Sequence, residues 1–195
     1  MGPAVPDLHD DVVVLRPPRE DDVDAITAAV QDPEIPRYTR IPSPYTRNDA
    51  TQFVRAAIEN WSGGRLPRVP AGDAQIGLSF MIVDRSDDSL IGGIGTHDSE
   101  NPEVREIGYW VARDARRRGI ATRAVRLLSR WAINELGLRR LELMTHVDNV
   151  ASQGVAERAG FTREGVLRSY TTLGCGLADV VMFSLLPEDL TAPNG

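Results

Sequence analysis

Three consecutive arginines, Arg116, Arg117 and Arg118, stand where the sequence predicts the start of an amphipathic helix. The first turn of a helix carries partial positive charge, so each cation placed there is unfavourable by roughly a few tenths of a kcal/mol. An anion bound at the same end would remove this conflict, because free helix amides and arginines would both face it. The sequence therefore predicts an anion site, with phosphate as the natural candidate.

The glycine that follows the arginines agrees with this interpretation. Gly119 has no side chain, so its backbone can approach an anion closely, and the small Ala121 keeps the next turn open. The chain contains neither a GxGxxG fingerprint nor a GxxxxGK[ST] loop, which weighs against a Rossmann domain and a P-loop NTPase. The alternative is a solvated surface run, which is the usual role of charge clusters.

The bulk composition indicates a globular, cytoplasmic protein. The chain has 195 residues, of which 42% are hydrophobic and 26% charged, which suits one domain with a sizeable core. The net charge of -6 argues against a nucleic-acid binder, which is usually basic. A single cysteine, Cys175, fits a reducing compartment. No secretory signal or membrane-spanning apolar run is visible in the sequence, so we expect no membrane association.

Hydrophobic periodicity divides the chain into strands and helices without an internal boundary. Seven segments are typical of β-strands: residues 12–18, 74–85, 89–98, 105–113, 138–147, 162–170 and 178–186. Four have helical spacing: residues 19–33, 49–61, 119–137 and 149–161. Residues 33–48 and 62–73 are predicted to be irregular, the second segment also mobile. We expect a single mixed α/β domain over residues 1–195, with its core at about 12–187 and flexible termini.

Four motifs in this order resemble the GNAT superfamily of N-acetyltransferases, which bind acetyl-CoA. RRRGIA resembles the superfamily's Q/R-x-x-G-x-G/A pyrophosphate loop, and NVASQGVAERAGF resembles its second cofactor-side helix. EGVLR with the later ADVVMFSLL resembles the RimJ/RimL-type branch, as does the early RYTRIPSPYTRNDATQFV. The resemblance implies a single, mostly antiparallel, splayed sheet of about six to seven strands flanked by helices. It also implies acetyl transfer to protein amino termini or other amines.

The resemblance assigns the cofactor site by position. The pyrophosphate of acetyl-CoA would lie on the backbone of Arg116, Arg117, Arg118, Gly119, Ile120, Ala121 and Thr122. The pantetheine arm would bond to the main chain of Val111, Ala112 and Arg113, and would also contact Asn149 and Ser152. An amide near Val111 would polarise the thioester carbonyl. No metal is implied, because the three histidines have no metal-ligand spacing.

Two side chains are candidates for the chemistry. Glu106 matches the glutamate that many superfamily members use as general base; the alternative is a strand glutamate in an ion pair. Ser152 matches the serine that assists the departing thiol in RimL-type members, and otherwise only caps its helix. Ala156 stands where many members have a tyrosine. An α-amino acceptor, with a pKa of about 7.7–8.0, needs less help from a base than a lysine amine at about 10.4.

The acceptor stays open between a peptide amino terminus, an amino acid, a polyamine and an aminoglycoside. The aromatic side chains that are candidates to line its pocket are Tyr38, Tyr109, Trp110 and Tyr170. His97 could reach the pocket mouth from the end of its strand, but a surface position is expected. The second function class is a non-catalytic acyl-CoA-binding or sensor module. Dimerisation is frequent in the family, so the resemblance allows a homodimer.

Overall fold

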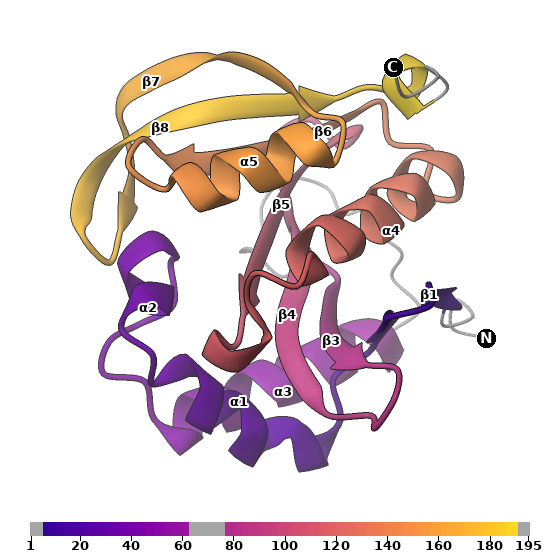
Figure 1. Cartoon of the computed structure of the whole chain (residues 1–195), viewed down its shortest axis with the longest axis vertical. Coiled ribbons are helices and arrows are strands. Elements are labelled where there is room, and N and C mark those ends of the chain that lie inside the picture. Colours follow the sequence, from indigo (N-terminus) through magenta and orange to yellow (C-terminus); the bar gives the residue numbers. More distant parts are fainter. Residues whose placement is uncertain (1–5, 63–76, 191–195) are drawn as a thin grey trace.

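The computed structural model describes residues 6–62 and 77–190, which build a mixed α/β fold around one eight-stranded sheet (Figure 1). The strand order is β1-β2-β3-β4-β5-β6-β8-β7. The strands are β1 (Leu8–His9), β2 (Val13–Arg16), β3 (Ser79–Asp84), β4 (Leu90–Asp98), β5 (Val104–Val111), β6 (Arg140–His146), β7 (Thr162–Leu173) and β8 (Gly176–Leu185). The strand beyond the expected seven is β1, whose two residues pair with β2. A segment this short leaves no periodic pattern in a sequence.

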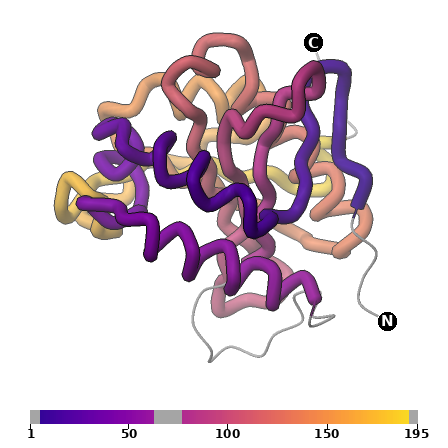
Figure 2. Tube along the Cα trace, turned by 90° about the horizontal axis from the view of Figure 1, so that it is seen from below, coloured from indigo at the N-terminus to yellow at the C-terminus, as the bar shows by residue number. Residues whose placement is uncertain are grey.

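Helices cover both faces of the sheet. They are α1 (Val23–Val30), α2 (Glu34–Tyr38), α3 (Arg47–Ser62), α4 (Ile120–Asn134) and α5 (Val150–Arg158), with 3-10 turns η1 (Glu20–Asp22), η2 (Arg113–Ala115) and η3 (Pro187–Leu190). One face carries α4 and α5; the other carries α1 and α3, which run side by side in Figure 2. No helix in the described ranges is long and apolar enough to cross a bilayer.

The two segments that the sequence predicts to be irregular are described to different extents in the structure. The segment predicted as irregular at 33–48 contains the short helix α2, which has a proline, Pro36, in its interior. The segment predicted as mobile at 62–73 lies outside the described residues, apart from Ser62, which ends α3. The outermost residues of both predicted flexible termini also lie outside the described ranges.

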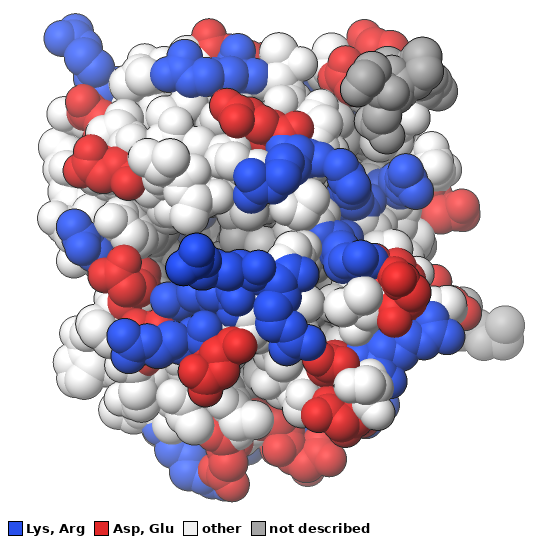
Figure 3. Space-filling model, viewed as in Figure 1, with Lys and Arg blue, Asp and Glu red and all other residues white. Residues whose placement is uncertain are grey.

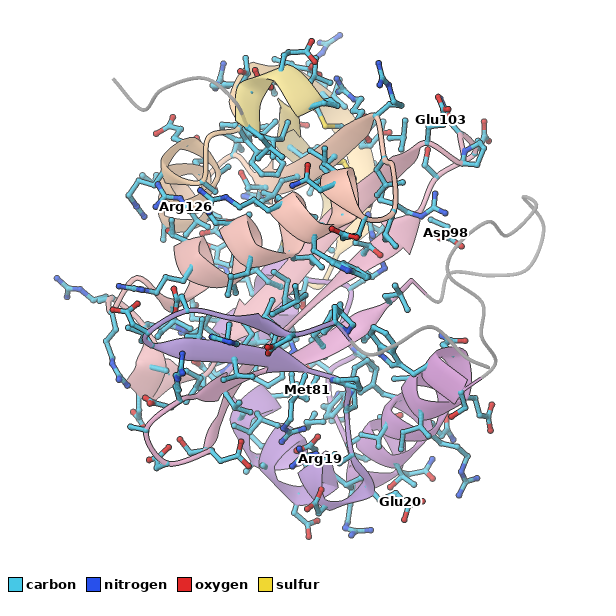
Figure 4. All side chains as sticks on the ribbon, turned by 90° about the vertical axis from the view of Figure 1, so that its right-hand side faces the viewer. Arg19, Glu20, Met81, Asp98, Glu103 and Arg126 are labelled. Carbon is cyan, nitrogen blue, oxygen red and sulfur yellow. The ribbon has the colours of Figure 1, made fainter. Side chains whose placement is uncertain are left out.

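The two faces of the sheet have separate hydrophobic clusters, because side chains alternate along a strand. On β3, Phe80 and Ile82 belong to the cluster that includes Leu128 of α4. Met81 and Val83 belong to the cluster formed with α1 and α3, and Figure 4 shows Met81 beside those helices. Full burial of each such side chain stabilises the fold by about 1.5–3 kcal/mol, so the clusters fix the helices against the sheet.

The pairing of β5 with β6 is short, and it is the one parallel pairing in the described sheet. Three residues of β5, Val104 to Glu106, pair with Arg140 to Glu142. Beyond this point β5 pairs only with β4, and β6 pairs only with β8. The two strands therefore diverge, which is the splay that the resemblance implied. We call this three-residue pairing and the gap beyond it the β5–β6 seam.

Candidate active site

A cavity of about 680 Å³ occupies the β5–β6 seam. Its walls include Tyr109 and Val111 from β5, Leu143 from β6, and residues at the start of α4 and α5. A second part of the wall comes from α2 and the residues that follow it. On the face that carries α4 and α5, basic side chains gather across the middle of the molecule (Figure 3), although the whole chain has a net charge of -6.

The loop before α4 lines this cavity, and its backbone conformation suits an anion. Arg117 and Gly119 have positive φ angles of 63° and 78°, and Gly119 is the residue before the first turn of α4. Alternation of left- and right-handed residues turns successive amides toward one point, which suits an anion. Ile120, Ala121 and Thr122 follow, and the first amides of a helix have no partner within it. A Cβ on Gly119 would meet nothing within 4 Å, so its backbone conformation is what favours glycine here.

The arginine run is only partly available to a ligand. Arg116 Nη2 lies 2.7 Å from Asp32 Oδ2, and its Nε donates to the Val111 carbonyl at 3.0 Å. Arg118 Nη2 lies 3.0 Å from Asp84 Oδ2. The prediction that all three cations face an anion is therefore wrong in part, because protein carboxylates compensate two of them. Arg117 lines the cavity and has no ion pair with any described residue.

Most of the residues predicted to bind the cofactor line this one cavity. They are Val111, Arg116, Arg117, Gly119, Ile120, Ala121, Thr122, Asn149 and Ser152. Three others, Ala112, Arg113 and Arg118, are not among the lining residues. Ala112 uses both of its main-chain groups inside the fold, since its amide donates to Ile91 and its carbonyl accepts from Ala115.

Strand geometry shows which amides of β5 point into the seam. Successive residues of a strand direct their hydrogen-bonding groups to opposite neighbours. The Ala112 amide bonds to the Ile91 carbonyl at 2.9 Å, on the β4 side. The amides of Val111 and Tyr109 therefore point to the other side, into the gap where β6 has diverged. The sequence-based prediction for this task was Val111, Ala112 and Arg113. The strand geometry favours Val111 and Tyr109.

Asn149, Ser152 and Tyr109 form a hydrogen-bonded group on the cofactor side. Asn149 Oδ1 accepts from the Ser152 amide at 3.1 Å, so Asn149 caps α5 as predicted. The Ser152 hydroxyl and the Tyr109 hydroxyl are 2.7 Å apart. Burial raises the pKa of Tyr109 to about 12, so this phenol is protonated at neutral pH and has a proton to donate. Ser152 therefore has a polar partner that the sequence analysis did not identify.

Glu106 lies at the closed end of the seam, in the last residue pair that joins β5 to β6. Its side chain is mostly buried and pairs with Arg40, with Nη2 and Oε2 3.1 Å apart. His97 stands opposite Glu106 on β4 and lines the cavity, so the expected surface position of His97 is wrong. Burial lowers the pKa of His97 below its ordinary value, so the imidazole is neutral at neutral pH.

Among the aromatic candidates, three of four line the cavity: Tyr38, Tyr109 and Trp110. Tyr170 is 55% exposed and does not line it. Sequence reasoning also missed Arg158, the last residue of α5, which lines the cavity and has no ion pair with a described residue. Gly154 leaves room for this side chain, because a Cβ at residue 154 would come within 2.9 Å of an Arg158 guanidinium nitrogen.

This arrangement joins an anion-binding loop to a gap in the sheet, and the comparisons with known proteins agree with it. Residues 13–162 match the model of the acetyltransferase (GNAT) domain family. The chain belongs to the GNAT family. It is 30% identical over 185 residues to the uncharacterized N-acetyltransferase p20 of Bacillus licheniformis, with 93% of this chain and 97% of that relative covered. It is 32% identical over 111 residues to the ribosomal-protein-serine acetyltransferase of Escherichia coli, with 56% and 62% covered.

Solved structures show the same GNAT fold. RimJ of Mycobacterium smegmatis, in complex with CoA-disulfide, superposes with a TM-score of 0.76 at 22% identity, covering 92% of this chain and 84% of RimJ. The protein is thus an acetyl-CoA-dependent acetyltransferase of this family. Its own residues fit the cofactor, because the loop amides, Arg117 and Arg158 would suit the diphosphate of acetyl-CoA. Within residues 6–62 and 77–190, no group of three or more His, Cys, Asp or Glu side chains is arranged to hold a metal ion.

Proposed function

We propose that the protein transfers acetyl from acetyl-CoA directly to a primary amine, either the α-amino group of a peptide or protein or the amine of a small molecule. The observation that carries this proposal is the placement of Glu106 at the closed end of the β5–β6 seam, with the anion-binding loop at its open end. A thioester lying along the seam would meet an acceptor amine beside Glu106.

The cofactor has two parts to be bound, an anionic pyrophosphate and a pantetheine arm. The pyrophosphate binds the loop amides of residues 117–122 and the guanidinium groups of Arg117 and Arg158. The pantetheine arm follows the seam along β5, where the amides of Tyr109 and Val111 lack a strand partner. One of these amides polarises the thioester carbonyl, which stabilises the negative charge that develops on its oxygen during attack.

In the proposed reaction, the acceptor nitrogen bonds to the acetyl carbon while the carbon–sulfur bond breaks. Glu106 accepts the proton that the nitrogen loses, directly or through one water. The hydrogen-bonded hydroxyls of Ser152 and Tyr109 stabilise the departing thiolate and can return a proton to it. Much of the rate enhancement would come from holding the two reactants together.

The test is the release of thiol from acetyl-CoA with a panel of amines. All 22 basic residues of this chain are arginine, so no side-chain amine of the enzyme itself competes as an acceptor. We expect thiol release to depend on the added amine. Binding of acetyl-CoA without thiol release across the panel would favour the alternative class, a non-catalytic acyl-CoA sensor.

Glu106→Gln provides the matched test of the base. The amide keeps the size of the side chain but cannot accept a proton, so we expect lower turnover with unchanged affinity for acetyl-CoA. The effect should be largest below the pKa of the acceptor amine, where the amine needs deprotonation most. A variant that equals the wild type at every pH would leave Glu106 with a structural role only.

A further inference from the structure

Arg40 and Glu106 form an ion pair in the part of the cavity where the acceptor must bind. The pair joins segments 66 residues apart in the sequence, with Arg40 Nη2 3.1 Å from Glu106 Oε2. Both side chains line the cavity. Glu106 is 19% exposed and Arg40 is 44% exposed, so solvent reaches the arginine more easily than the carboxylate.

The backbone around Arg40 is fixed on both sides. Thr39 Oγ1 donates to the Ile35 carbonyl at 2.7 Å and accepts from the Ile41 amide at 3.2 Å. The Gly174 amide, at the tip of the β7–β8 hairpin, donates to the Thr39 carbonyl at 3.2 Å. Figure 1 shows this hairpin reaching α2 from the far end of the sheet. Arg40 therefore has a defined place in the cavity wall.

The hairpin can approach this closely only because residue 174 is glycine. A Cβ on Gly174 would lie 1.9 Å from the Pro36 carbonyl oxygen, in the backbone of α2. The contact holds the hairpin tip against α2, and residues of both elements line the cavity. A small acceptor suits a site with this boundary better than a folded protein surface does.

The ion pair places a condition on the acceptor. Arg40 contacts one carboxylate oxygen of Glu106, Oε2, so an acceptor nitrogen that binds this carboxylate lies next to the Arg40 guanidinium. An acceptor that brings an ammonium group alone places a second positive charge beside Arg40, which is unfavourable. An acceptor that also brings a carboxylate satisfies both partners, since Arg binds carboxylates in a two-pronged geometry.

The remaining wall on this side is apolar. Ile35, Ile41 and Phe53 line it, together with Met81 and Trp110. The other charged or titratable groups here are Glu34, which pairs with Arg37 at 3.4 Å, the phenol of Tyr38 and the neutral imidazole of His97. The site thus offers a cation, an anion and an apolar surface to one ligand.

We propose that the acceptor is a free α-amino acid with an apolar side chain, whose amino group binds Glu106 and whose carboxylate binds Arg40. This inference rests on the function proposed above, and names its substrate class. An α-amino acid carries its amine and carboxylate on the same carbon, which matches a site whose own cation and anion are 3.1 Å apart. A polyamine would place further positive charge against Arg40.

The experiment compares leucine with leucinamide, which differ only in the carboxylate. Leucinamide has the more weakly basic amine, so simple amine chemistry would favour it. We expect kcat/KM for leucine to exceed that for leucinamide by about tenfold or more, because a hydrogen bond to a charged group is lost in the amide. In Arg40→Ala this ratio should fall to about one, and Arg40→Lys should retain part of it.

Arg37→Ala is the matched control, since Arg37 is a neighbouring, exposed arginine that does not line the cavity. It should keep the wild-type ratio. The inference is overturned if leucinamide equals leucine with the wild type, or if Arg40→Ala leaves the ratio unchanged. Acetylation of peptides or of spermidine, but not of amino acids, would overturn it while the proposed function stands. If no amine in the panel is acetylated, both fall.

Discussion

The hydroxyl groups of Tyr109 and Ser152, 2.7 Å apart, join β5 to α5 across the cavity. Tyr109 is half-buried, and Val111, two residues further along β5, directs an amide into the same gap. A serine hydroxyl alone is a poor proton donor, but here a phenol stands behind it. We therefore propose that the pair acts as a short proton relay to the departing thiolate.

Tyr109→Phe keeps the ring and removes only the phenol, so it tests this relay. We expect a loss in kcat of about tenfold or more with little change in acetyl-CoA affinity. Ser152→Ala should give a similar loss, and the double variant should be no worse than the more damaged single variant, because the hydroxyls act together. Losses that multiply in the double variant would show that the two hydroxyls act independently. Steady-state kinetics of the four proteins decides.

Gly119 and Gly137 give a matched pair for the anion loop. They flank α4 with φ angles of 78° and 71°, and a Cβ would meet nothing within 4 Å at either. Alanine at each position should cost about 1–2 kcal/mol of folding stability, because the left-handed region disfavours it. Only Gly119→Ala should also weaken acetyl-CoA binding by calorimetry, and Gly119→Glu should weaken it more by repulsion. Equal affinities in both alanine variants would move the anion site elsewhere.

Arg117 and Arg118 are adjacent arginines with different partners. Arg118 pairs with Asp84, whereas Arg117 lines the cavity. We expect Arg117→Ala to weaken acetyl-CoA binding by about tenfold at low salt and to reduce its salt dependence. Arg118→Ala should change the affinity much less, because its charge is already compensated. Calorimetry at two salt concentrations separates the two cases, and the reverse order of effects would contradict the assignment.

Glu164 makes stability depend on pH. Hydrogen bonds from the Arg140 guanidinium and then from Ser184 lower the pKa of Glu164 from 4.5 to about 2. A carboxyl whose pKa is lower in the folded state stabilises the protein above its unfolded pKa. That stabilisation is present above about pH 4.5 and is lost as the pH falls toward about 2. Its size should stay under about 1 kcal/mol, because Glu164 is 39% exposed.

Glu164→Gln should therefore lower the melting temperature at pH 7 and converge on the wild type near pH 2.5. Arg163→Gln, at the preceding and exposed position of β7, serves as the control for a surface change on that strand. A constant difference between Glu164→Gln and the wild type across this range would rule out titration of Glu164 as the cause.

The long elements of this fold were predictable because their signals are periodic. α4 repeats buried residues at helical spacing from Ile120 to Leu128, and glycines with positive φ stand at its two ends. β1 and α2 were not, since two or five residues carry no period and Pro36 argues against a helix. Whether such short segments form a strand or a helix is decided by their tertiary contacts, such as the pairing of β1 with β2.

The candidate site also has one part that the sequence predicts and one part that it does not. The loop at 116–122 was predictable because one contiguous segment supplies the amides and the glycine. The contacts of Arg40 with Glu106, and of Tyr109 with Ser152, join residues 66 and 43 positions apart. Pairings at such separations depend on strand register and on how the hairpin tip meets α2, and a single sequence contains no direct record of either.

The brevity of the β5–β6 pairing has a consequence for dynamics. Three residue pairs connect the two halves of the sheet at its centre, so the amide hydrogens of Tyr109 and Val111 should exchange with solvent faster than those facing β4. A ligand arm with peptide-like groups in the gap would replace the missing inter-strand hydrogen bonds and slow that exchange. Binding of this arm would complete the sheet and its release would interrupt it again. The protein would therefore be more rigid with the ligand bound than without it.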